Sequence, residues 1–217
     1  MLVFHERLAR LGLDVAARYG FVLAGGYAIS MNGMGDRPSM DVDLFTNRMT
    51  PENFATAADA VEQAYRGAGF DVSETVRAAL FLDLHVGDPA TGEESDVQLG
   101  VNYRAFPPAT VRIGPVLDPR DAVAGKMSAL WSRGEARDFI DIDTVLASGR
   151  FTREDVVKLA DEQEAQPMDR GLLAARFRMA ELHPAQVYAR YGVDGERRTA
   201  LVARFVAWAD EIDPQGP

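Results

Sequence analysis

The chain has 217 residues, of which 47% are hydrophobic and 26% charged, and its formal net charge at pH 7 is -10. This length and composition fit a globular protein with a full hydrophobic core. The lack of cysteine excludes disulfides, cysteine-ligated zinc and a catalytic thiol. The negative charge argues against a general polyanion binder, because affinity for nucleic acid depends largely on neutralising phosphates with lysine and arginine.

The beginning of the chain, M-L-V-F-H-E-R-L-A-R, lacks the uninterrupted apolar core of a signal peptide. No later run approaches the length that spans a membrane. We therefore expect a cytoplasmic protein with no membrane partner, and the absence of cysteine fits a reducing compartment.

The first part of the chain carries alternating helix and strand patterns. Helices are indicated by apolar residues at helical spacing, and strands by short apolar or alternating runs. Gly20 ends the first helix, and Pro51 begins the second. In chain order, the pattern predicts a helix over residues 6–19, a strand over 21–24, a strand over 40–45 and a helix from 51 to the glycines at 67 and 69.

The next segment predicts a hairpin, after which the chain becomes helical. Residues 79–86 and 96–101 alternate like strands and are joined by the turn-forming loop G-D-P-A-T-G-E-E. We predict an α/β (α+β) fold, with a mixed-sheet domain over residues 1–115 and a helical region over 116–217. The remaining predicted elements are a strand over 111–113, helices over 120–132 and 137–146, and helical structure from 151 onward, where Thr152 is an N-cap.

Two carboxylates alternate in the run R-P-S-M-D-V-D-L-F-T. Residues two apart on a strand project from the same face, so Asp41 and Asp43 point together, while Met40, Val42 and Leu44 are expected to face the core. Such a pair can bind one divalent cation, or it can form an acidic solvent-facing side of a strand. The second interpretation is weakened because aspartate is depleted in strands and two close like charges repel without a compensating cation.

A third carboxylate would complete an oxygen-rich site that suits Mg²⁺ or Mn²⁺. Asp96 begins the strand D-V-Q-L-G-V and shares a face with Gln98. The competing candidate is Asp83, which lies with His85 on the polar side of L-F-L-D-L-H-V. We favour Asp96 and keep Asp83 as the alternative.

Gly25 and Gly26 follow an apolar strand and precede a segment, Y-A-I-S-M, that can start a helix. Without side chains, the backbone can approach a phosphate closely, and N–H groups at a helix start attract anions. Glycines in a tight strand-to-helix turn are also used for conformation alone. The turn lies shortly before the acidic pair in the sequence, and this position favours a functional role.

These motifs in order, V-L-A-G-G-Y-A-I and then R-P-S-M-D-V-D-L-F, resemble the AbiEii/AbiGii nucleotidyltransferase family of the DNA polymerase β-like superfamily, which includes bacterial abortive-infection toxins and the MenT toxins. A later segment, A-V-A-G-K-M-S-A-L-W-S-R-G-E-A-R-D-F-I-D, looks like the family's K-x-x-A-L-x-x-R-x-x-x-R-D-x-x-D pattern. The resemblance covers about residues 20–146. It implies a nucleotidyltransferase core over residues 1–115 and a helical region that completes the active site.

The resemblance also implies roles for individual residues. Asp41 and Asp43 would bind the metal ions, with Asp96 as the third carboxylate. The glycine turn would hold the triphosphate of the incoming nucleotide. Residues that match other family positions are Arg37 and Ser39, which would position phosphate, and Lys126 of the later motif. A serine is common after the first glycine in the wider superfamily, whereas Gly26 stands here, so triphosphate contacts would depend more on backbone amides.

The later segment also places charged residues at helical spacing. Lys126 and Arg133 lie seven residues apart and therefore on one face of a helix, where their charges could neutralise triphosphate or simply be solvated. The acidic partner in this motif is Asp138 or Asp141. For both, helix capping and ion pairing with Arg133 or Arg137 is the competing interpretation. We place Asp138 among the catalytic candidates and leave Asp141 open.

The implied reaction is the metal-dependent transfer of a nucleoside monophosphate from a nucleoside triphosphate to an acceptor hydroxyl. The resemblance to MenT-like toxins makes the 3′ end of tRNA the expected acceptor and implies a cognate antitoxin protein as a partner. The alternatives are an enzyme that nucleotidylates a protein or a small molecule, and a nucleotide-binding module without catalysis.

Arginines gather locally despite the acidic composition. Between Ala165 and Val206 there are seven arginines and four acidic residues. They are the expected acceptor-binding surface, to which Tyr188 and Tyr191 could add stacking, or else they are solvated faces of amphipathic helices. Four aromatic residues of the region are predicted as core: Phe177, Tyr188, Phe205 and Trp208.

Overall fold

The computed structural model describes residues 1–214 and separates into two compact units. Unit 1 contains residues 1–32 and 38–122, and unit 2 contains residues 33–37 together with the chain from Val123 onward. Unit 1 is built on a mixed β-sheet, whereas the elements of unit 2 are helices. The predicted α/β fold class is therefore confirmed.

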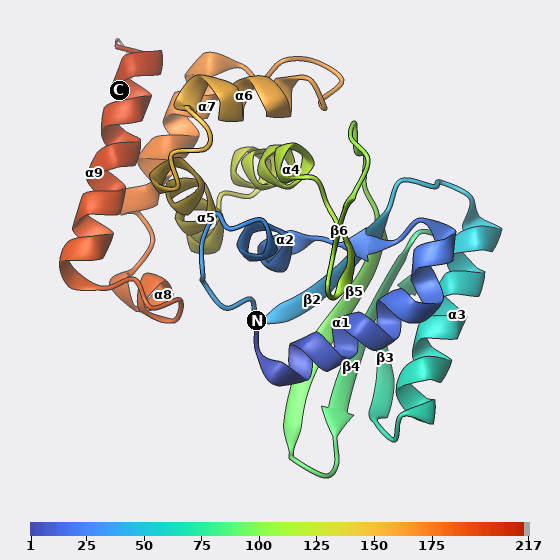
Figure 1. Cartoon of the computed structure of the whole chain (residues 1–217). Coiled ribbons are helices and arrows are strands. Elements are labelled where there is room, and N and C mark those ends of the chain that lie inside the picture. Colours follow the sequence, from blue (N-terminus) through green and yellow to red (C-terminus); the bar gives the residue numbers. More distant parts are fainter. Residues whose placement is uncertain (215–217) are drawn as a thin grey trace. The chain divides into compact units, whose positions relative to one another are not determined.

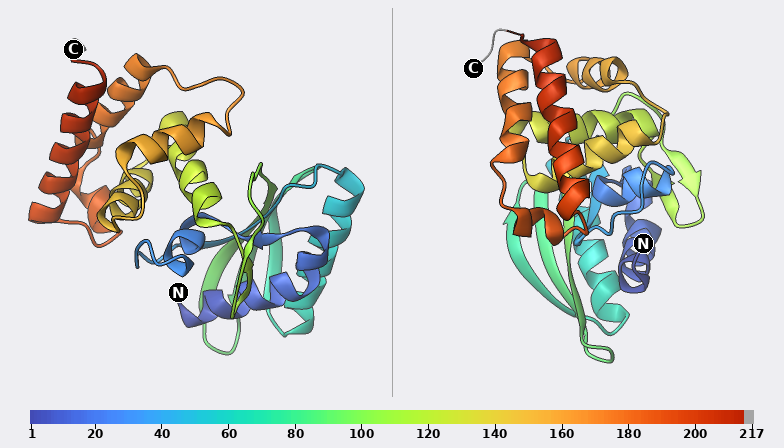
Figure 2. Two further views of the ribbon diagram at one scale, coloured as in Figure 1. Left: turned by 45° about the horizontal axis from the view of Figure 1, so that its top comes forward. Right: turned by 90° about the vertical axis from the view of Figure 1, so that its left-hand side faces the viewer.

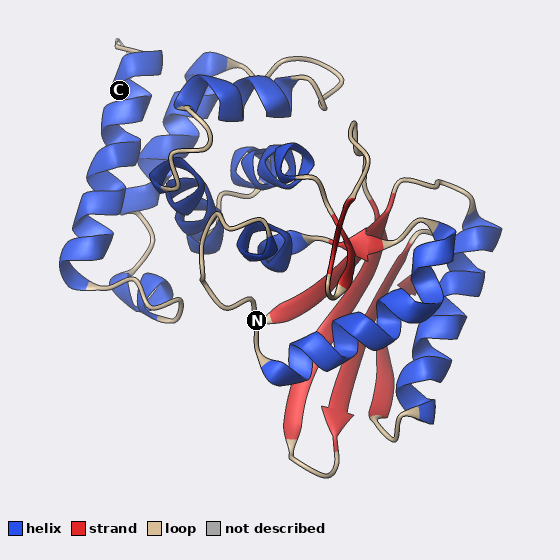
Figure 3. Cartoon of the chain, in the orientation of Figure 1, coloured by secondary structure: helices blue, strands red, loops and turns tan. Residues whose placement is uncertain are grey.

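The strands of unit 1 form a single sheet, drawn in red in Figure 3. Their order is β3-β4-β5-β2-β1-β7-β6; β2 runs parallel to β5 and β1 parallel to β7, and the other neighbours are antiparallel. Strand β2 therefore has hydrogen-bonded partners on both sides. The strands are β1 (Val22–Leu23), β2 (Asp41–Thr46), β3 (Asp71–Ala78), β4 (Phe81–Asp88), β5 (Glu93–Val101), β6 (Ala109–Val111) and β7 (Gly114–Val116).

The two faces of this sheet differ in chemistry. On one face, Val42 and Leu44 of β2 are completely buried, as are the residues opposite them on β5, Val97 and Leu99. The alternate residues of β2, beginning with Asp41, are half-buried. Because successive side chains of a strand point to opposite faces, the sequence alternation produces one apolar and one acidic face.

Helices α1 and α3 lie along the apolar face of the sheet and against each other (Figure 1). The buried hydroxyl of Tyr65 on α3 donates a hydrogen bond to the carbonyl oxygen of Leu8 on α1, at 3.0 Å. The first of these helices ends at Ala16, and the 3-10 turn that follows it ends where Gly20 adopts a positive φ of 85°. The helices and the 3-10 turn of unit 1 are α1 (Val3–Ala16), η1 (Ala17–Tyr19), α2 (Gly25–Met31) and α3 (Pro51–Gly67).

Three details of unit 1 differ from the prediction. Met40 is 66% exposed rather than facing the core, because it lies in a bend before β2, where strand alternation has not begun. The strand predicted over residues 111–113 is a hairpin of β6 and β7, with Arg112 and Ile113 in its turn. Strand β3 was not predicted, since its residues are mostly exposed and show no apolar alternation.

Unit 2 is a helical assembly in which α7 and α9 pack side by side, as both views of Figure 2 show. Thr152 caps α6 as predicted: its hydroxyl accepts a hydrogen bond from the Asp155 amide, and the Asp155 carboxylate accepts one from the Thr152 amide. The elements are α4 (Pro119–Ser132), which begins in unit 1, α5 (Ala136–Ala147), α6 (Arg153–Asp161), α7 (Arg170–Arg178), η2 (Met179–Glu181), α8 (Ala185–Ala189) and α9 (Gly195–Ile212).

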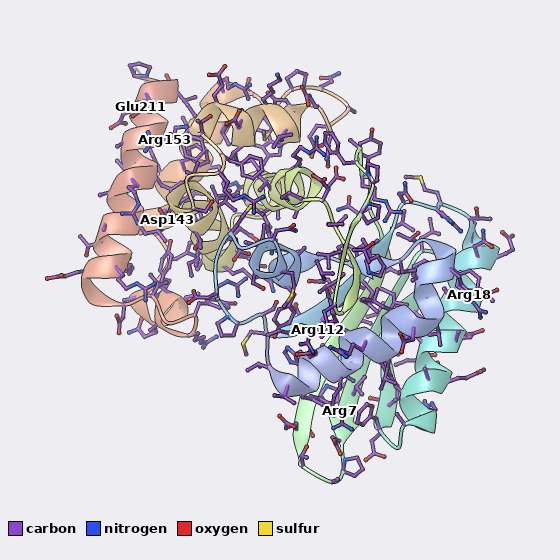
Figure 4. All side chains as sticks on the ribbon, viewed as in Figure 1. Arg7, Arg18, Arg112, Asp143, Arg153 and Glu211 are labelled. Carbon is purple, nitrogen blue, oxygen red and sulfur yellow. The ribbon has the colours of Figure 1, made fainter. Side chains whose placement is uncertain are left out.

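Aromatic side chains form the core of unit 2. The rings of Phe177 and Trp208 have centroids 4.3 Å apart, and Phe205 packs edge-on against Phe139 at 5.0 Å. Tyr188 is also fully buried, and its hydroxyl donates to the carbonyl of Ala180. The prediction of these residues as core is confirmed, and the stacking role considered for Tyr188 is wrong, because its ring is not accessible. On the surface, Arg153 of α6 pairs with Glu211 of α9 at 2.6 Å (Figure 4).

Within the described residues 1–214, none of the helices combines the length and the apolar composition needed to cross a bilayer.

A buried histidine links the N-terminal helix to α2. His5 is 4% exposed, and its Nδ1 lies 2.6 Å from the hydroxyl of Tyr27. Burial lowers the pKa of His5 below its ordinary value of 6.5, although the charge of Asp41 acts in the opposite direction. The imidazole is therefore neutral in the folded protein at neutral pH.

We expect the free energy of unfolding to fall as the pH is lowered from about 7 to about 5, in part because of His5. Since its pKa is lowered on folding, the unfolded state takes up the proton first. The contribution of the neutral His5 to the free energy of unfolding is complete above the ordinary histidine pKa, and it is lost as the pH falls below that value. His5→Gln keeps a polar partner for Tyr27 but cannot be protonated, so urea denaturation should show a shallower pH slope than for the wild type. Equal slopes would contradict this assignment.

Candidate active site

Asp41 and Asp43 project from the same face of β2, as predicted from their spacing, and both are half-buried. The segment before the strand supports the first of them: the buried hydroxyl of Ser39 donates a hydrogen bond to Asp41 Oδ1 at 2.7 Å. Ser39 is thus in place to orient a carboxylate, and its predicted contact with phosphate stays a prediction.

The glycine turn touches the second carboxylate. Gly25 has a positive φ of 58°, and a Cβ atom added to it would lie 1.7 Å from Asp43 Oδ2. The amide of Ala24, just before it, donates to the carbonyl oxygen of Asp43 at 2.9 Å. Only glycine fits here, both for its backbone conformation and for its contact with the Asp43 side chain. Close approach of a phosphate and turn conformation were both predicted reasons for a glycine here, and the contact with Asp43 is a further one within the protein.

The strand register aligns further polar groups with the pair. Asp96 of β5 lies directly opposite Asp41, and Gln98 lies opposite Asp43. One strand further, His85 of β4 pairs with Asp96 and Asp83 with Gln98. The acidic face therefore extends over three neighbouring strands.

The two candidates for a third carboxylate differ in surroundings. The side chain of Asp96 is 56% exposed, and its Oδ1 lies 2.9 Å from His85 Nδ1, which raises the pKa of that imidazole. Asp83 is one strand further from β2, and its Oδ1 is buried without a hydrogen-bond donor among the described residues. Burial, followed by the charges of Asp96 and Asp41, raises the pKa of Asp83. The register favours Asp96, whose role as a ligand stays a prediction.

The donor chemistry of this face suits a hard cation, since carboxylate oxygens are the usual ligands of Mg²⁺ and Mn²⁺. Among residues 1–214, however, no three histidine, aspartate or glutamate side chains are gathered in an arrangement that could hold a metal ion. Asp41 and Asp43 stay the predicted pair of ligands, and a third ligand would have to turn toward them.

A hydrogen-bonded support behind Asp41 was missed in the sequence. The hydroxyl of Tyr27 lies next to His5 and donates to the carbonyl oxygen of Ser39 at 3.4 Å, and Ser39 in turn bonds Asp41. Tyr27, Ser39 and His5 are all buried. The available signal was the position of Tyr27 directly after the glycine pair and of His5 on the apolar side of the first helix.

In unit 2, Asp141 on α5 holds two of the predicted cations. Arg37 donates to it through Nε at 2.8 Å and Nη2 at 3.0 Å, and Lys126 Nζ lies 2.8 Å from its Oδ2. Although burial alone would raise the pKa of Asp141, the charges of Lys126 and Arg37 hold it below its ordinary value. Arg37 also lies over the ring of Tyr191, at 5.1 Å. The acidic partner of Lys126 in the later motif is therefore Asp141.

Asp138 has a different environment. Its carboxylate is fully buried, accepts two hydrogen bonds from Arg133 at 2.8 and 2.9 Å, and accepts a third from the amide of Glu135. It thereby completes the capping box at the start of α5. Both of its oxygens are engaged, so this geometry supports the capping interpretation more than the catalytic one.

Most of the seven arginines between residues 165 and 206 have partners within unit 2. Arg176 donates to the carbonyl oxygens of Trp131 and Ser132 at the end of α4. Arg190 and Arg197 are exposed and form no ion pair within residues 1–214. The ion pairs are Arg170 with Asp161, Arg178 with Asp210, and Arg204 with Asp143.

A mixed sheet whose central strand carries alternating carboxylates beside a glycine turn is consistent with a nucleotidyltransferase, and the comparison with protein families shows that class. The family model for the nucleotidyl transferase AbiEii toxin of type IV toxin-antitoxin systems matches residues 8–207. The chain belongs to this family, and it is a nucleotidyltransferase of the toxin class. Membership also implies a nucleoside triphosphate substrate and a cognate antitoxin. The resemblance found in the sequence is confirmed.

Solved structures share the fold. MenT4, the nucleotidyltransferase toxin Rv2826c from Mycobacterium tuberculosis H37Rv, is 18% identical with a TM-score of 0.63, covering 97% of this chain and 84% of its own. A protein of H. pylori assigned as a nucleotidyltransferase is 14% identical, with a TM-score of 0.60 and coverage of 98% and 95%. JHP933 from Helicobacter pylori is 17% identical, with a TM-score of 0.51 and coverage of 98% and 92%. No curated protein sequence matches the chain.

Gly25→Ala should destabilise the protein and displace the Asp43 carboxylate, because the new methyl group overlaps Oδ2 and the positive φ disfavours alanine by about 1–2 kcal/mol. Gly67→Ala is the control, since nothing lies within 4 Å of its added Cβ and the residue is helical. Thermal unfolding should show a lower Tm for the first variant and an unchanged or higher Tm for the second. Equal Tm values would contradict the close contact.

Asp141→Asn should lower the free energy of unfolding by about 3–5 kcal/mol, because it leaves the buried Arg37 and Lys126 without their shared counter-charge. Asp143→Asn is the matched control on the same helix. Its partner Arg204 is 52% exposed, so the expected change is about 1 kcal/mol or less. Denaturant titrations compare the two, and a similar small change in both would argue against a buried ion cluster.

Proposed function

We propose that this nucleotidyltransferase transfers a nucleoside monophosphate from a nucleoside triphosphate to the 3′ hydroxyl of tRNA, in a metal-dependent reaction, and that it acts as a toxin in this way. The observation that carries the proposal is the acidic face of β2, where Asp41 and Asp43 point together and each is supported, by Ser39 and by Gly25. In the reaction, the acceptor oxygen bonds to the α-phosphorus, the bond to the β-phosphate oxygen breaks, and pyrophosphate and the hydroxyl proton leave.

Asp41 and Asp43, with Asp96 as the third carboxylate, are the proposed ligands of Mg²⁺ or Mn²⁺. The bound cation supplies charge neutralisation on the phosphates and lowers the pKa of the acceptor hydroxyl. The hydrogen bond from Ser39 holds Asp41 in one orientation, and the turn at Gly25 fixes the side on which Asp43 can lie. These contacts prearrange the carboxylates before substrate binds.

Lys126, Arg37 and the amides of Gly25 and Gly26 are proposed to bind the triphosphate. Asp141 holds the Arg37 guanidinium and the Lys126 ammonium in place. An arginine and a lysine sharing one carboxylate leave an excess of positive charge, which suits a polyphosphate. In this proposal Asp141 is a positioning residue for Arg37 and Lys126. Asp138 contributes indirectly, because it caps the start of α5.

The tRNA acceptor is proposed from the resemblance to MenT-like toxins and from the chemistry of a free RNA end, which proteins recognise by stacking and phosphate contacts. In unit 2, the exposed Arg190 and Arg197 are the arginines we assign to acceptor binding, because their guanidinium groups are not engaged in ion pairs.

The reaction is tested with α-labelled nucleoside triphosphates incubated with tRNA, protein or small-molecule fractions. Asp43→Asn should reduce label transfer at least about 100-fold, because it weakens the cation site, while the fold persists. Asp71→Asn removes an exposed carboxylate at the start of β3 and should leave the rate unchanged. EDTA should abolish transfer, and added Mg²⁺ or Mn²⁺ should restore it.

The fraction that becomes labelled identifies the acceptor. Label in tRNA supports the proposal, whereas label in protein or a small molecule would overturn the acceptor. Wild-type rates of transfer by Asp43→Asn would overturn the site.

A further inference from the structure

Three arginines of unit 1, Arg18, Arg48 and Arg104, form no ion pair with a carboxylate among the described residues. They are unusual in an acidic protein, because the other arginines of the unit all have acidic partners. Those pairs are Arg7 with Asp88, Arg10 and Arg112 with Glu6, Arg66 with Glu62, Arg77 with Asp59, Glu62 and Glu74, and Arg120 with Asp118.

The parallel pairing of β2 and β5 brings two of these arginines together. The amide of Asn102 donates to the carbonyl oxygen of Thr46 at 2.8 Å, which extends the pairing just past the ends of both strands. Arg48 follows Thr46 by two residues, and Arg104 follows Asn102 by two residues. Their loops therefore leave the sheet side by side, at the end opposite Asp41.

Two of the arginines reach η1, the turn that follows α1, and the third belongs to it. Arg48 donates through Nη1 to the carbonyl oxygen of Arg18 at 3.0 Å, and Arg104 donates through Nη1 to that of Gly20 at 3.1 Å. A Cβ added at Gly20 would lie 2.9 Å from Arg48 Nε, so the guanidinium packs on the bare backbone. Arg18 stands on the same turn (Figure 4).

The arginine cluster is accessible to solvent, and the loop that carries Arg104 is fixed by hydrogen bonds. Asp121 is buried and accepts hydrogen bonds from the amides of Ala105 and Phe106, which fixes the loop that carries Arg104. Burial, and then the nearby charge of Arg48, lowers the pKa of Arg104, although Asp121 acts in the opposite direction. Arg18 and Arg48 are exposed. The like charges of Arg48 and Arg104 repel, and an anion between them would relieve that repulsion.

Aromatic rings accompany these charges. Tyr103, beside Arg104, is 52% exposed, and Tyr19 lies under the Arg18 guanidinium at 4.9 Å. Fixed arginines interleaved with accessible rings suit a nucleic-acid strand, whose phosphates bind guanidinium groups and whose bases stack on aromatic faces.

We propose that Arg18, Arg48 and Arg104 form a phosphate-binding surface for the backbone of the RNA acceptor. The inference rests on the proposed function, because it takes the acceptor to be RNA. The surface lies beyond the end of β2, whose backbone spans about 17 Å from Asp41 to Thr46. It therefore contacts RNA away from the reacting hydroxyl and contributes to RNA affinity rather than to the chemical step.

The test measures binding of fluorescein-labelled tRNA by anisotropy, without nucleoside triphosphate. The variant Arg18→Gln/Arg48→Gln/Arg104→Gln keeps amide donors for the backbone carbonyls but removes three charges. Its affinity should fall at least about tenfold, and the slope of log K against log salt should decrease by about 2, since each lost contact to single-stranded RNA removes about 0.7. The loss should be similar for different RNA sequences.

The matched control is Arg7→Gln/Arg66→Gln/Arg112→Gln, which removes the same charge from exposed, ion-paired arginines. It should change the affinity less than about threefold, because these charges are neutralised in the protein. An equal loss in the control, or unchanged affinity in the test variant, would overturn the proposal. So would a failure of the wild-type protein to bind tRNA.

Two further measurements keep the outcomes separate. Arg18→Gln alone, whose side chain contacts a ring and no carbonyl, should weaken binding about threefold even if the triple variant does not fold. Calorimetry with inorganic phosphate identifies the anion: loss of phosphate binding with unchanged tRNA affinity would assign the arginines to a small anion and overturn RNA.

Pyrophosphate release by the same samples distinguishes the two proposals. Arginine-dependent tRNA binding without any transfer to tRNA refutes the proposed function and leaves the surface standing. Transfer to tRNA that is equally efficient at low RNA concentration in the triple variant refutes the surface alone.

Discussion

The parallel pairing of β2 with β5 is the constraint on which the site of unit 1 depends. It sets Asp41 opposite Asp96 and Val42 opposite Val97, so the apolar residues of both strands reach the same face. A shift of one residue would move every carboxylate into the core and every valine into solvent. Burial of the apolar face against α1 and α3 thus fixes the position of the acidic face, and Gly25 at the start of α2 packs against the Asp43 side chain.

Charges are compensated differently in the two units. In unit 2, one buried carboxylate, Asp141, holds two cations, and these cations lower its pKa. On the acidic face of unit 1, Asp83 instead has a raised pKa, because burial and neighbouring carboxylates disfavour its charge. Carboxylates with raised pKa values are enriched at sites that bind ligands, although Gln98 and His85 partly offset the shift at Asp83. The Asp141 carboxylate thus has cations beside it, whereas the carboxylates of the acidic face lie beside one another.

Local patterns in the sequence predicted the elements that have a strong periodicity or a clear cap. The alternation around Asp41, the proline at the start of α3 and the Thr152 cap were each sufficient, because their causes lie within a few residues. Strand β3 could not be predicted in this way, since it is an exposed edge strand. Nor could the sharing of Asp141 by Arg37 and Lys126, which joins residues 104 positions apart. Spacing predicted which face a side chain occupies, and tertiary contacts decided its partner.

The same two strands also separate charge along their length. Asp41 and Asp96 lie near the beginnings of β2 and β5, whereas Arg48 and Arg104 follow their ends. The parallel direction of β2 and β5 makes this possible, because both acids lie toward one end of the strand pair and both arginines lie beyond its other end. A net charge of -10 conceals the arrangement, since it averages over both ends. Phosphates are repelled at the acidic end unless a cation is bound there, and they are attracted at the basic end without one. Under the proposed function, the basic end would hold a polyanionic acceptor while only its terminal hydroxyl enters the acidic end.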